Sequence, residues 1–201
     1  FLKRRNPAAT VLISDPSWEN HRALFEGAGF EVAAYPYYDA KARGVDVPGM
    51  LAALEAAAPG TVVVLHACCH NPTGYDIAAQ VWPRIIEILR ARNLVAFLDL
   101  AYQGFGDGID EDGAVVRMCL EAGIDFFIAT SFSKSFSLYG ERVGALSVVC
   151  ASKDEASRVL SQLKRVIRAN YVNPPTHGAQ VVTTVLGTPA LRATWEKELA
   201  A

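Results

Sequence analysis

The sequence predicts an α/β protein in which helices cover both faces of a mostly parallel sheet, a three-layer α/β/α arrangement. Two observations indicate this fold class. Short apolar runs alternate along the chain with longer segments of helical character. The apolar runs are also nearly continuous, without the polar alternation of a strand that has one face in water. That composition is typical of parallel strands buried on both faces.

Five apolar runs are predicted as strands, at residues 11–14, 31–35, 61–66, 94–99 and 125–130, and a sixth β-rich run covers residues 143–150. The run at 61–66 opens with four β-branched residues, which favour a strand because they pack well on a pleated surface. An aromatic turn, residues 35–39, follows the second run.

Helices are predicted at residues 19–28, 48–58, 77–92, 112–122, 153–169, 174–186 and 189–199. The first stops at Gly29, a residue that suits the position after a helix. The segment 77–92 places Ile77, Val81, Ile85 and Leu89 on one face. Pro83 lies inside that segment and indicates a kink or a boundary, because proline removes a helix donor.

Composition excludes several classes of protein. The 201 residues are 51% hydrophobic and 20% charged, with a formal net charge of −2, which suits one α/β domain with a sizeable core. This balance provides no basic field for nucleic acid, and no apolar stretch is long enough for a membrane span. Both ends of the sequence look cut, so we expect a fragment of a longer protein.

The cysteines and histidines do not predict a metal site. None of the four cysteines has CxxC spacing, and we expect free thiols in a cytoplasmic protein. His66 and His70 are four residues apart, but a strand and a turn separate them instead of a helix face.

Polar side chains follow three of the predicted strands at the point where each strand ends. Asn71 follows the run at 61–66, Asp99 and Tyr102 follow the next run, and Lys134 follows the run at 125–130. Ligands of such sheets bind beyond the carboxyl ends of the strands, and right-handed crossovers place these ends on one rim. The four side chains are therefore expected to converge.

These residue types fit pyridoxal phosphate. A lysine at the mouth of a sheet can lose its proton and attack a carbonyl, and serines with Arg142 can hold a phosphate. Asp99 suits a protonated pyridine nitrogen, since a buried carboxylate needs a cation. Tyr102 and Asn71 could bind the phenolic oxygen, and Trp18 could stack on the ring.

Each of these residues also has a structural interpretation. Lys134 could be a solvated lysine in a polar connection, and Asp99 a helix cap or turn residue. Tyr102 and Trp18 could simply pack, and Asn71 could belong to an ordinary Asn-Pro turn.

The motifs resemble those of class I aminotransferases of the fold type I pyridoxal-phosphate family. The resemblance is carried, in order, by His70-Asn71-Pro72-Thr73-Gly74, by residues 99–104, and by Ser131-Phe132-Ser133-Lys134 through residues 141–144. It covers essentially the whole chain. Residues 68–71 and 101–105 are similar to the aspartate and aromatic amino-acid subgroup. Residues 14–21 and 135–140 look closer to bacterial aromatic-amino-acid (tyrosine) aminotransferases.

The resemblance implies a role for each matching residue. Lys134 forms the Schiff base and shuttles a proton, and Asp99 pairs with the pyridine nitrogen. Asn71 and Tyr102 bind the phenolic oxygen. Ser131, Ser133 and Arg142 hold the phosphate, and Trp18 packs on the ring, with Asn71 and Trp18 also meeting substrate. Arg168 matches an arginine that reaches the partner subunit's site in a homodimer, although on its own it would be a solvated arginine.

The implied activity is transfer of the amino group of an aromatic or dicarboxylic amino acid to 2-oxoglutarate, by a ping-pong cycle through pyridoxamine phosphate. Residues 1–201 would form the central, large domain. The upstream phosphate loop, a partner tyrosine and the arginine for the α-carboxylate are expected outside this chain, with the N-terminal segment and most of the small domain. Alternatives are a non-catalytic ligand-sensing domain and another reaction on the same cofactor, such as β-elimination.

Overall fold

A six-stranded sheet forms the centre of the computed structural model, which describes residues 1–200. Its strands are β1 (Thr10–Asp15), β2 (Glu31–Pro36), β5 (Val62–His66), β6 (Val95–Leu100), β7 (Phe126–Ser131) and β8 (Gly144–Val149), in the spatial order β2-β1-β5-β6-β7-β8. The first five are mutually parallel, whereas β8 pairs antiparallel with β7. The predicted α/β class with a mostly parallel sheet is confirmed.

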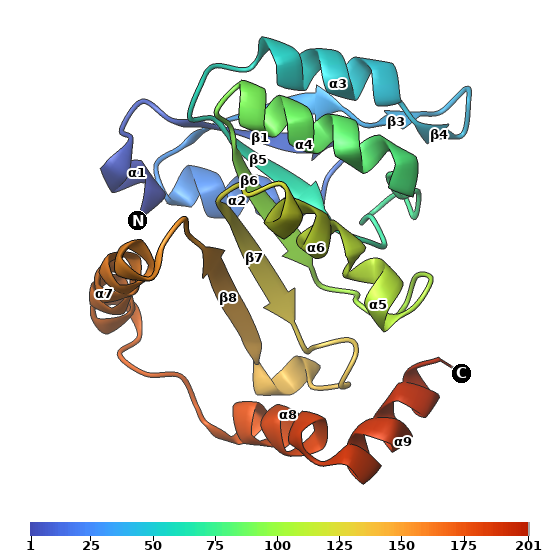
Figure 1. Ribbon diagram of the computed structural model, residues 1–201, viewed down its shortest axis with the longest axis vertical. Coiled ribbons are helices and arrows are strands. Elements are labelled where there is room, and N and C mark those ends of the chain that lie inside the picture. The colour runs from blue at the N-terminus through green and yellow to red at the C-terminus, as the bar shows by residue number, and fades with distance from the viewer. Residues whose placement is uncertain (201) are drawn as a thin grey trace.

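Helices lie on both faces of this sheet (Figure 1). One layer contains α3 (Val47–Ala56), α4 (Trp82–Ala91), α5 (Ile109–Asp112) and α6 (Ala114–Glu121), and the other contains α1 (Leu2–Arg5), α2 (Glu19–Gly27) and α7 (Lys153–Asn170). Alternate residues of β5 enter different cores. Val63 and Leu65 pack in the core under α3 and α4, while Val62 and Val64 pack in the smaller core with Phe30. A strand whose two faces are both covered has to be continuously apolar, as β5 is.

Three predicted elements differ from the structure in more than their end residues. The first turns of the helix predicted at 77–92 are absent: a short 3-10 turn, η1 (Ala79–Val81), precedes α4. Pro83 is the second residue of α4, where its missing N–H costs nothing, so the proline marks the helix start. The helix predicted at 112–122 is interrupted at Gly113 and becomes α5 and α6. Residues in the aromatic turn instead form part of a small hairpin of β3 (Tyr38–Asp39) and β4 (Gly44–Val45).

The last two helices lie beside the loop that follows β7 (Figure 1). After η2 (Tyr139–Glu141) and β8, the chain forms α7, α8 (His177–Gly187) and α9 (Pro189–Leu199). The Trp195 indole on α9 donates a hydrogen bond of 2.6 Å to the Ser135 carbonyl and stacks on Phe136 with the ring centroids 4.6 Å apart. This contact holds α9 against the segment that carries Lys134. Among the described residues, none of the helices has the length and apolar character needed to cross a bilayer.

Candidate active site

A cavity of about 630 Å³ opens at the carboxyl ends of β5, β6 and β7. The strands are hydrogen-bonded neighbours, so the segments that follow them begin side by side, as the sequence predicts. Eight of the nine predicted site residues line this cavity: Trp18, Asn71, Asp99, Tyr102, Ser131, Ser133, Lys134 and Arg142. The structure therefore brings together residues that are up to 124 positions apart in the sequence (142 − 18).

Lys134 lies in the connection between β7 and η2 and is partly buried. Its Nζ lies 4.4 Å from the ring centroid of Tyr139 and 5.9 Å from that of Tyr102. Both distances are within the range of cation–π attraction. The amine is thus held in the cavity between two aromatic rings, where it can meet a carbonyl group.

Ser131, Ser133 and Arg142 provide donors for an anion on the same wall. The Ser133 amide donates to Ser131 Oγ over 3.2 Å. Arg142 has a positive φ of 52°, and its Nη1 donates to the Tyr139 carbonyl over 2.8 Å, which directs the guanidinium across the loop. A guanidinium with nearby hydroxyls is suited to a phosphate group.

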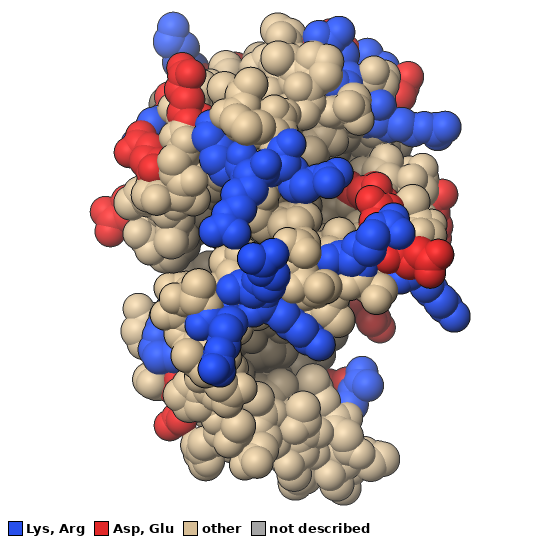
Figure 2. All heavy atoms as spheres, turned by 90° about the vertical axis from the view of Figure 1, so that its left-hand side faces the viewer, with Lys and Arg blue, Asp and Glu red and all other residues tan. Residues whose placement is uncertain are grey.

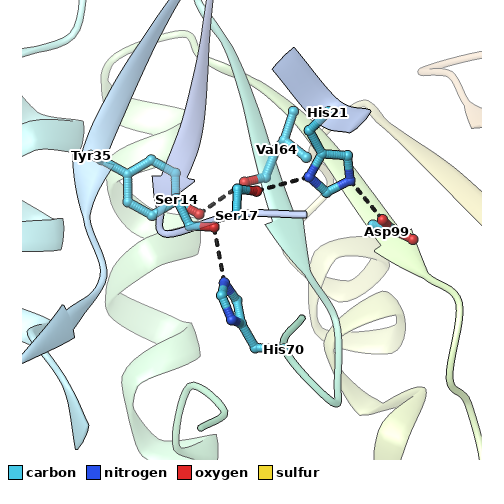
Figure 3. Close-up of polar contacts among 7 residues, drawn as sticks. All are labelled: Ser14, Ser17, His21, Tyr35, Val64, His70 and Asp99. Carbon is cyan, nitrogen blue, oxygen red and sulfur yellow. Dashed lines mark hydrogen bonds and ion pairs between the residues drawn. The ribbon is translucent and has the colours of Figure 1, made fainter. Parts of the chain in front are cut away.

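Asp99 lies within β6, in register with His66 on β5 and Ala129 on β7. The strand continues to Leu100, so the expectation that Asp99 ends it is wrong by one residue. Asp99 Oδ2 accepts a hydrogen bond of 2.8 Å from His21 Nε2, and Ser17 Oγ lies 2.9 Å from the other ring nitrogen of His21 (Figure 3). Because a carboxylate only accepts, Nε2 carries the proton, and in a neutral imidazole Nδ1 then accepts from the Ser17 hydroxyl.

The turn that carries Asn71 is fixed by a carboxylate. Both oxygens of Asp76 accept backbone hydrogen bonds, from Cys69 N and His70 N, each at 2.7 Å. His70 is buried, with Ser14 Oγ 2.9 Å from Nε2 and Thr73 Oγ1 2.8 Å from Nδ1. These contacts set the position of Asn71 at the cavity wall.

The loop after Tyr102 is held in a similar way. Asp112 is buried, and its carboxylate accepts hydrogen bonds from Gly104 N (2.7 Å), Gly106 N (3.0 Å) and Asp107 N (3.0 Å). Three backbone donors compensate the cost of burying this charge. The resulting rigid loop fixes the backbone just after Tyr102.

Trp18 and Arg168 occupy different environments. Trp18 is the residue before α2, and its ring meets that of His21 edge to face with the centroids 5.3 Å apart. Its side chain is 38% exposed and faces the cavity, which leaves one side of the ring available to a ligand. Arg168 is exposed near the end of α7 and does not line the cavity.

Sequence reasoning missed five residues that organise the site: Ser17, His21, Asp76, Tyr139 and Asp112. His21 carried a signal, because it lies three positions after Trp18 and so on the same face of the helix start. Asp112 carried none, since nothing in its spacing shows that its partners are backbone amides.

A positively charged surface lies beside the cavity. Figure 2 shows Lys and Arg side chains gathered around a hollow on the side of the molecule where α1 and α7 lie. Lys3, Arg4 and Arg5 belong to α1, and Lys134 and Arg142 line the cavity itself. Although the net charge is −2, this face favours an anionic ligand.

The fold and this site define an aminotransferase-type protein, and the chain belongs to the family of class I and II aminotransferases, whose model matches residues 1–201. The chain is 63% identical over 199 residues to the aspartate aminotransferase of Pseudomonas aeruginosa. This match covers 99% of this chain and 50% of that protein. It is 53% identical over 199 residues to the aromatic-amino-acid aminotransferase of Escherichia coli. This match also covers 99% of this chain and 50% of the relative.

A solved structure has the same fold. The aromatic-amino-acid aminotransferase from Burkholderia pseudomallei, crystallised covalently bound to pyridoxal phosphate, superposes with a TM-score of 0.98 at 64% identity. The alignment covers 99% of this chain and 50% of that one. This chain thus spans about half the length of the relatives it matches, and it shares the α/β fold of fold type I aminotransferases.

Proposed function

We propose that the full-length protein is a pyridoxal-phosphate-dependent aminotransferase that moves the amino group of an aromatic or dicarboxylic amino acid to 2-oxoglutarate. The observation that carries the proposal is the shared cavity wall: an amine, a guanidinium with hydroxyls, and a carboxylate held by an imidazole all line one cavity. Similar relatives carry both the aspartate and the aromatic names, which supports both substrate classes.

The residues fit the cofactor by their chemistry. Lys134 would supply the amine for its aldehyde group, and Arg142, Ser131 and Ser133 would supply donors for its phosphate. Asp99, oriented by His21, would supply the carboxylate for the ring nitrogen. Tyr102 and Asn71 would supply donors for the phenolic oxygen, and Trp18 would supply a flat apolar surface for the ring.

The chain's own residues would move protons while the cofactor supplies an electron sink for the charge left at the substrate's α-carbon. Lys134 Nζ would take the α-proton as general base and return it as general acid. Asp99 would keep a proton on the ring nitrogen, because a carboxylate in a half-buried site stabilises a cation beside it. Tyr139 and Tyr102 would hold the amine within reach.

We also propose a cytoplasmic homodimer with residues 1–201 as its large domain. The exposed Arg168, which lies outside this chain's own cavity, would serve the distal carboxylate of a substrate in the partner subunit. The four cysteines are free thiols, which supports a reducing compartment.

The test mixes the full-length protein with pyridoxal phosphate and then, in single turnover, with tyrosine or aspartate. We expect the absorption band of the lysine-bound cofactor to be lost and the matching 2-oxo acid to appear, and 2-oxoglutarate to restore the band. A band that ignores amino acids would support a ligand-sensing domain, and release of ammonia would support elimination. Either outcome would overturn the proposal.

A further inference from the structure

Three potential metal ligands lie together beneath the cavity. A nitrogen of His21, a nitrogen of His66 and a carboxylate oxygen of Asp99 are all within 4.8 Å of one another. Asp99 and His66 are in register on β6 and β5, and His21 reaches them from the first turn of α2. Figure 3 shows His21 directed at Asp99. All three side chains line the cavity, so an ion has a route to them.

His66 lacks hydrogen-bond partners. It is 7% exposed, and within residues 1–200 neither Nδ1 nor Nε2 has one. Its nearest aromatic neighbours are the rings of His70 and His21, with centroids 4.3 Å and 5.1 Å away. A buried polar group without a partner destabilises the folded state, because it has lost its hydrogen bonds to water. A ligand that bonds to one of these nitrogens would recover part of that loss.

In its neutral form the imidazole of His66 has one ring nitrogen with a free lone pair. Neutral imidazole is the form that binds metals. With His21 and Asp99 it completes a set of two imidazoles and one carboxylate, which suits Zn²⁺ and related divalent ions.

We propose that, before the cofactor binds, His21, His66 and Asp99 form a site for a divalent transition-metal ion of the zinc class, and that the ion and the cofactor exclude each other. The exclusion rests on the proposed function, because Asp99 is also the proposed partner of the cofactor's ring nitrogen. The binding itself does not rest on it.

Because Ser17 can accept a hydrogen bond from Nδ1, His21 can bind a metal ion without releasing its ring proton. In the structure Nε2 carries the proton toward Asp99, and Ser17 Oγ lies beside Nδ1. When the metal bonds to Nε2, the ring proton moves to Nδ1 and is donated to Ser17 Oγ instead. The serine then orients the metal-bound imidazole, as partners of metal-ligating histidines do.

A second cluster provides the control. Sγ of Cys68, Sγ of Cys69 and a carboxylate oxygen of Asp112 also lie within 4.8 Å of one another. That carboxylate already accepts three backbone hydrogen bonds, and burial raises the pKa of both thiols. Thiols with raised pKa values are poor ligands, because a thiol must lose its proton to bind a metal.

The experiment titrates Zn²⁺ by calorimetry into the full-length protein stripped of cofactor, in a buffer free of chelators. We expect one ion per chain, with affinity at least tenfold weaker in His66→Leu and unchanged in Cys69→Ser. Zn²⁺ should slow the appearance of the cofactor's absorption band in the parent protein and have a much smaller effect in His66→Leu. Far-UV circular dichroism checks the folding of each variant. If His66→Leu is unfolded, His66→Gln is used in its place.

Several outcomes would overturn the proposal: no saturable Zn²⁺ binding, binding lost in Cys69→Ser but retained in His66→Leu, or binding that leaves cofactor capture unchanged. A parent protein that never captures pyridoxal phosphate would refute the proposed function instead. The calorimetric titration would still test the metal site in that case.

Discussion

His21 Nε2 lies 2.8 Å from Asp99 Oδ2, and this contact joins the start of α2 to the middle of the sheet. The pair is separated by 78 positions in the sequence. The hydrogen bond from His21 orients the Asp99 carboxylate, and the Asp99 side chain lines the cavity. His21 can therefore affect how Asp99 binds a molecule in the cavity without contacting that molecule.

Replacement of His21 by Phe should weaken cofactor binding about tenfold, which corresponds to about 1.4 kcal/mol. Phe keeps an aromatic ring beside Trp18 but leaves Asp99 without its donor. Equilibrium titration with pyridoxal phosphate measures the change. Ser17→Ala, which keeps the His21–Asp99 contact, should have a smaller effect, and equal losses in the two variants would contradict the assigned role of His21.

Tyr139 positions the two cations of the cavity. Lys134 Nζ lies 4.4 Å and the Arg142 guanidinium carbon 5.3 Å from its ring centroid. Tyr139→Leu removes both contacts, each worth about 0.5–1 kcal/mol, and should reduce cofactor affinity about threefold to tenfold. Tyr139→Phe retains an aromatic face and should bind almost as the parent does. If Phe and Leu behave alike, the ring face has no role.

Asp112 should be important for stability. Asn at this position has only one acceptor oxygen, and its amide group would face a backbone N–H. Asp112→Asn should therefore lower the free energy of unfolding by about 2–4 kcal/mol. Urea denaturation of the full-length protein measures it, with the exposed Glu121→Gln on α6 as control. A loss no larger than that of the control would show that the loop tolerates unpaired amides.

The buried His66 predicts loss of stability in mild acid. Its pKa is about 3 in the folded protein and 6.5 in its ordinary state. The unfolded chain therefore binds a proton below pH 6.5 that the folded chain does not, so stability falls as pH drops from 6.5 toward 3. The slope is up to about 1.4 kcal/mol per pH unit. Unfolding measured from pH 7.5 to 5 should show a shallower slope for His66→Gln, whereas the exposed His177→Gln should match the parent.

The sequence predicted the sheet well because burial on both faces leaves a strong signal. The apolar run around Val63 matches β5 to within one residue. The first and last residues of the helices were harder to predict, because local turns and prolines determine them. The apolar spacing through Ile77 suggested a helix that the structure starts only at Trp82, because Ile77 is buried from a loop.

Asn71, Tyr102 and Lys134 could be predicted to lie together because each follows a strand, and parallel strands end on one rim. The supporting residues could not be found that way. His21, Asp76 and Asp112 act through contacts made by folding, and two of them bind backbone amides whose identity leaves no trace in the sequence. The proximity of His21, His66 and Asp99 could not be predicted for a related reason, since they come from three separate elements.

The most direct test of the central claim is to identify the residue that bonds to the cofactor. The full-length protein is incubated with pyridoxal phosphate, reduced with borohydride, digested and analysed by mass spectrometry. The account predicts a single modified lysine, Lys134, and no stoichiometric modification in Lys134→Ala, whereas the exposed Lys164→Ala should be labelled like the parent. Modification of another lysine, or none in the parent, would contradict the account.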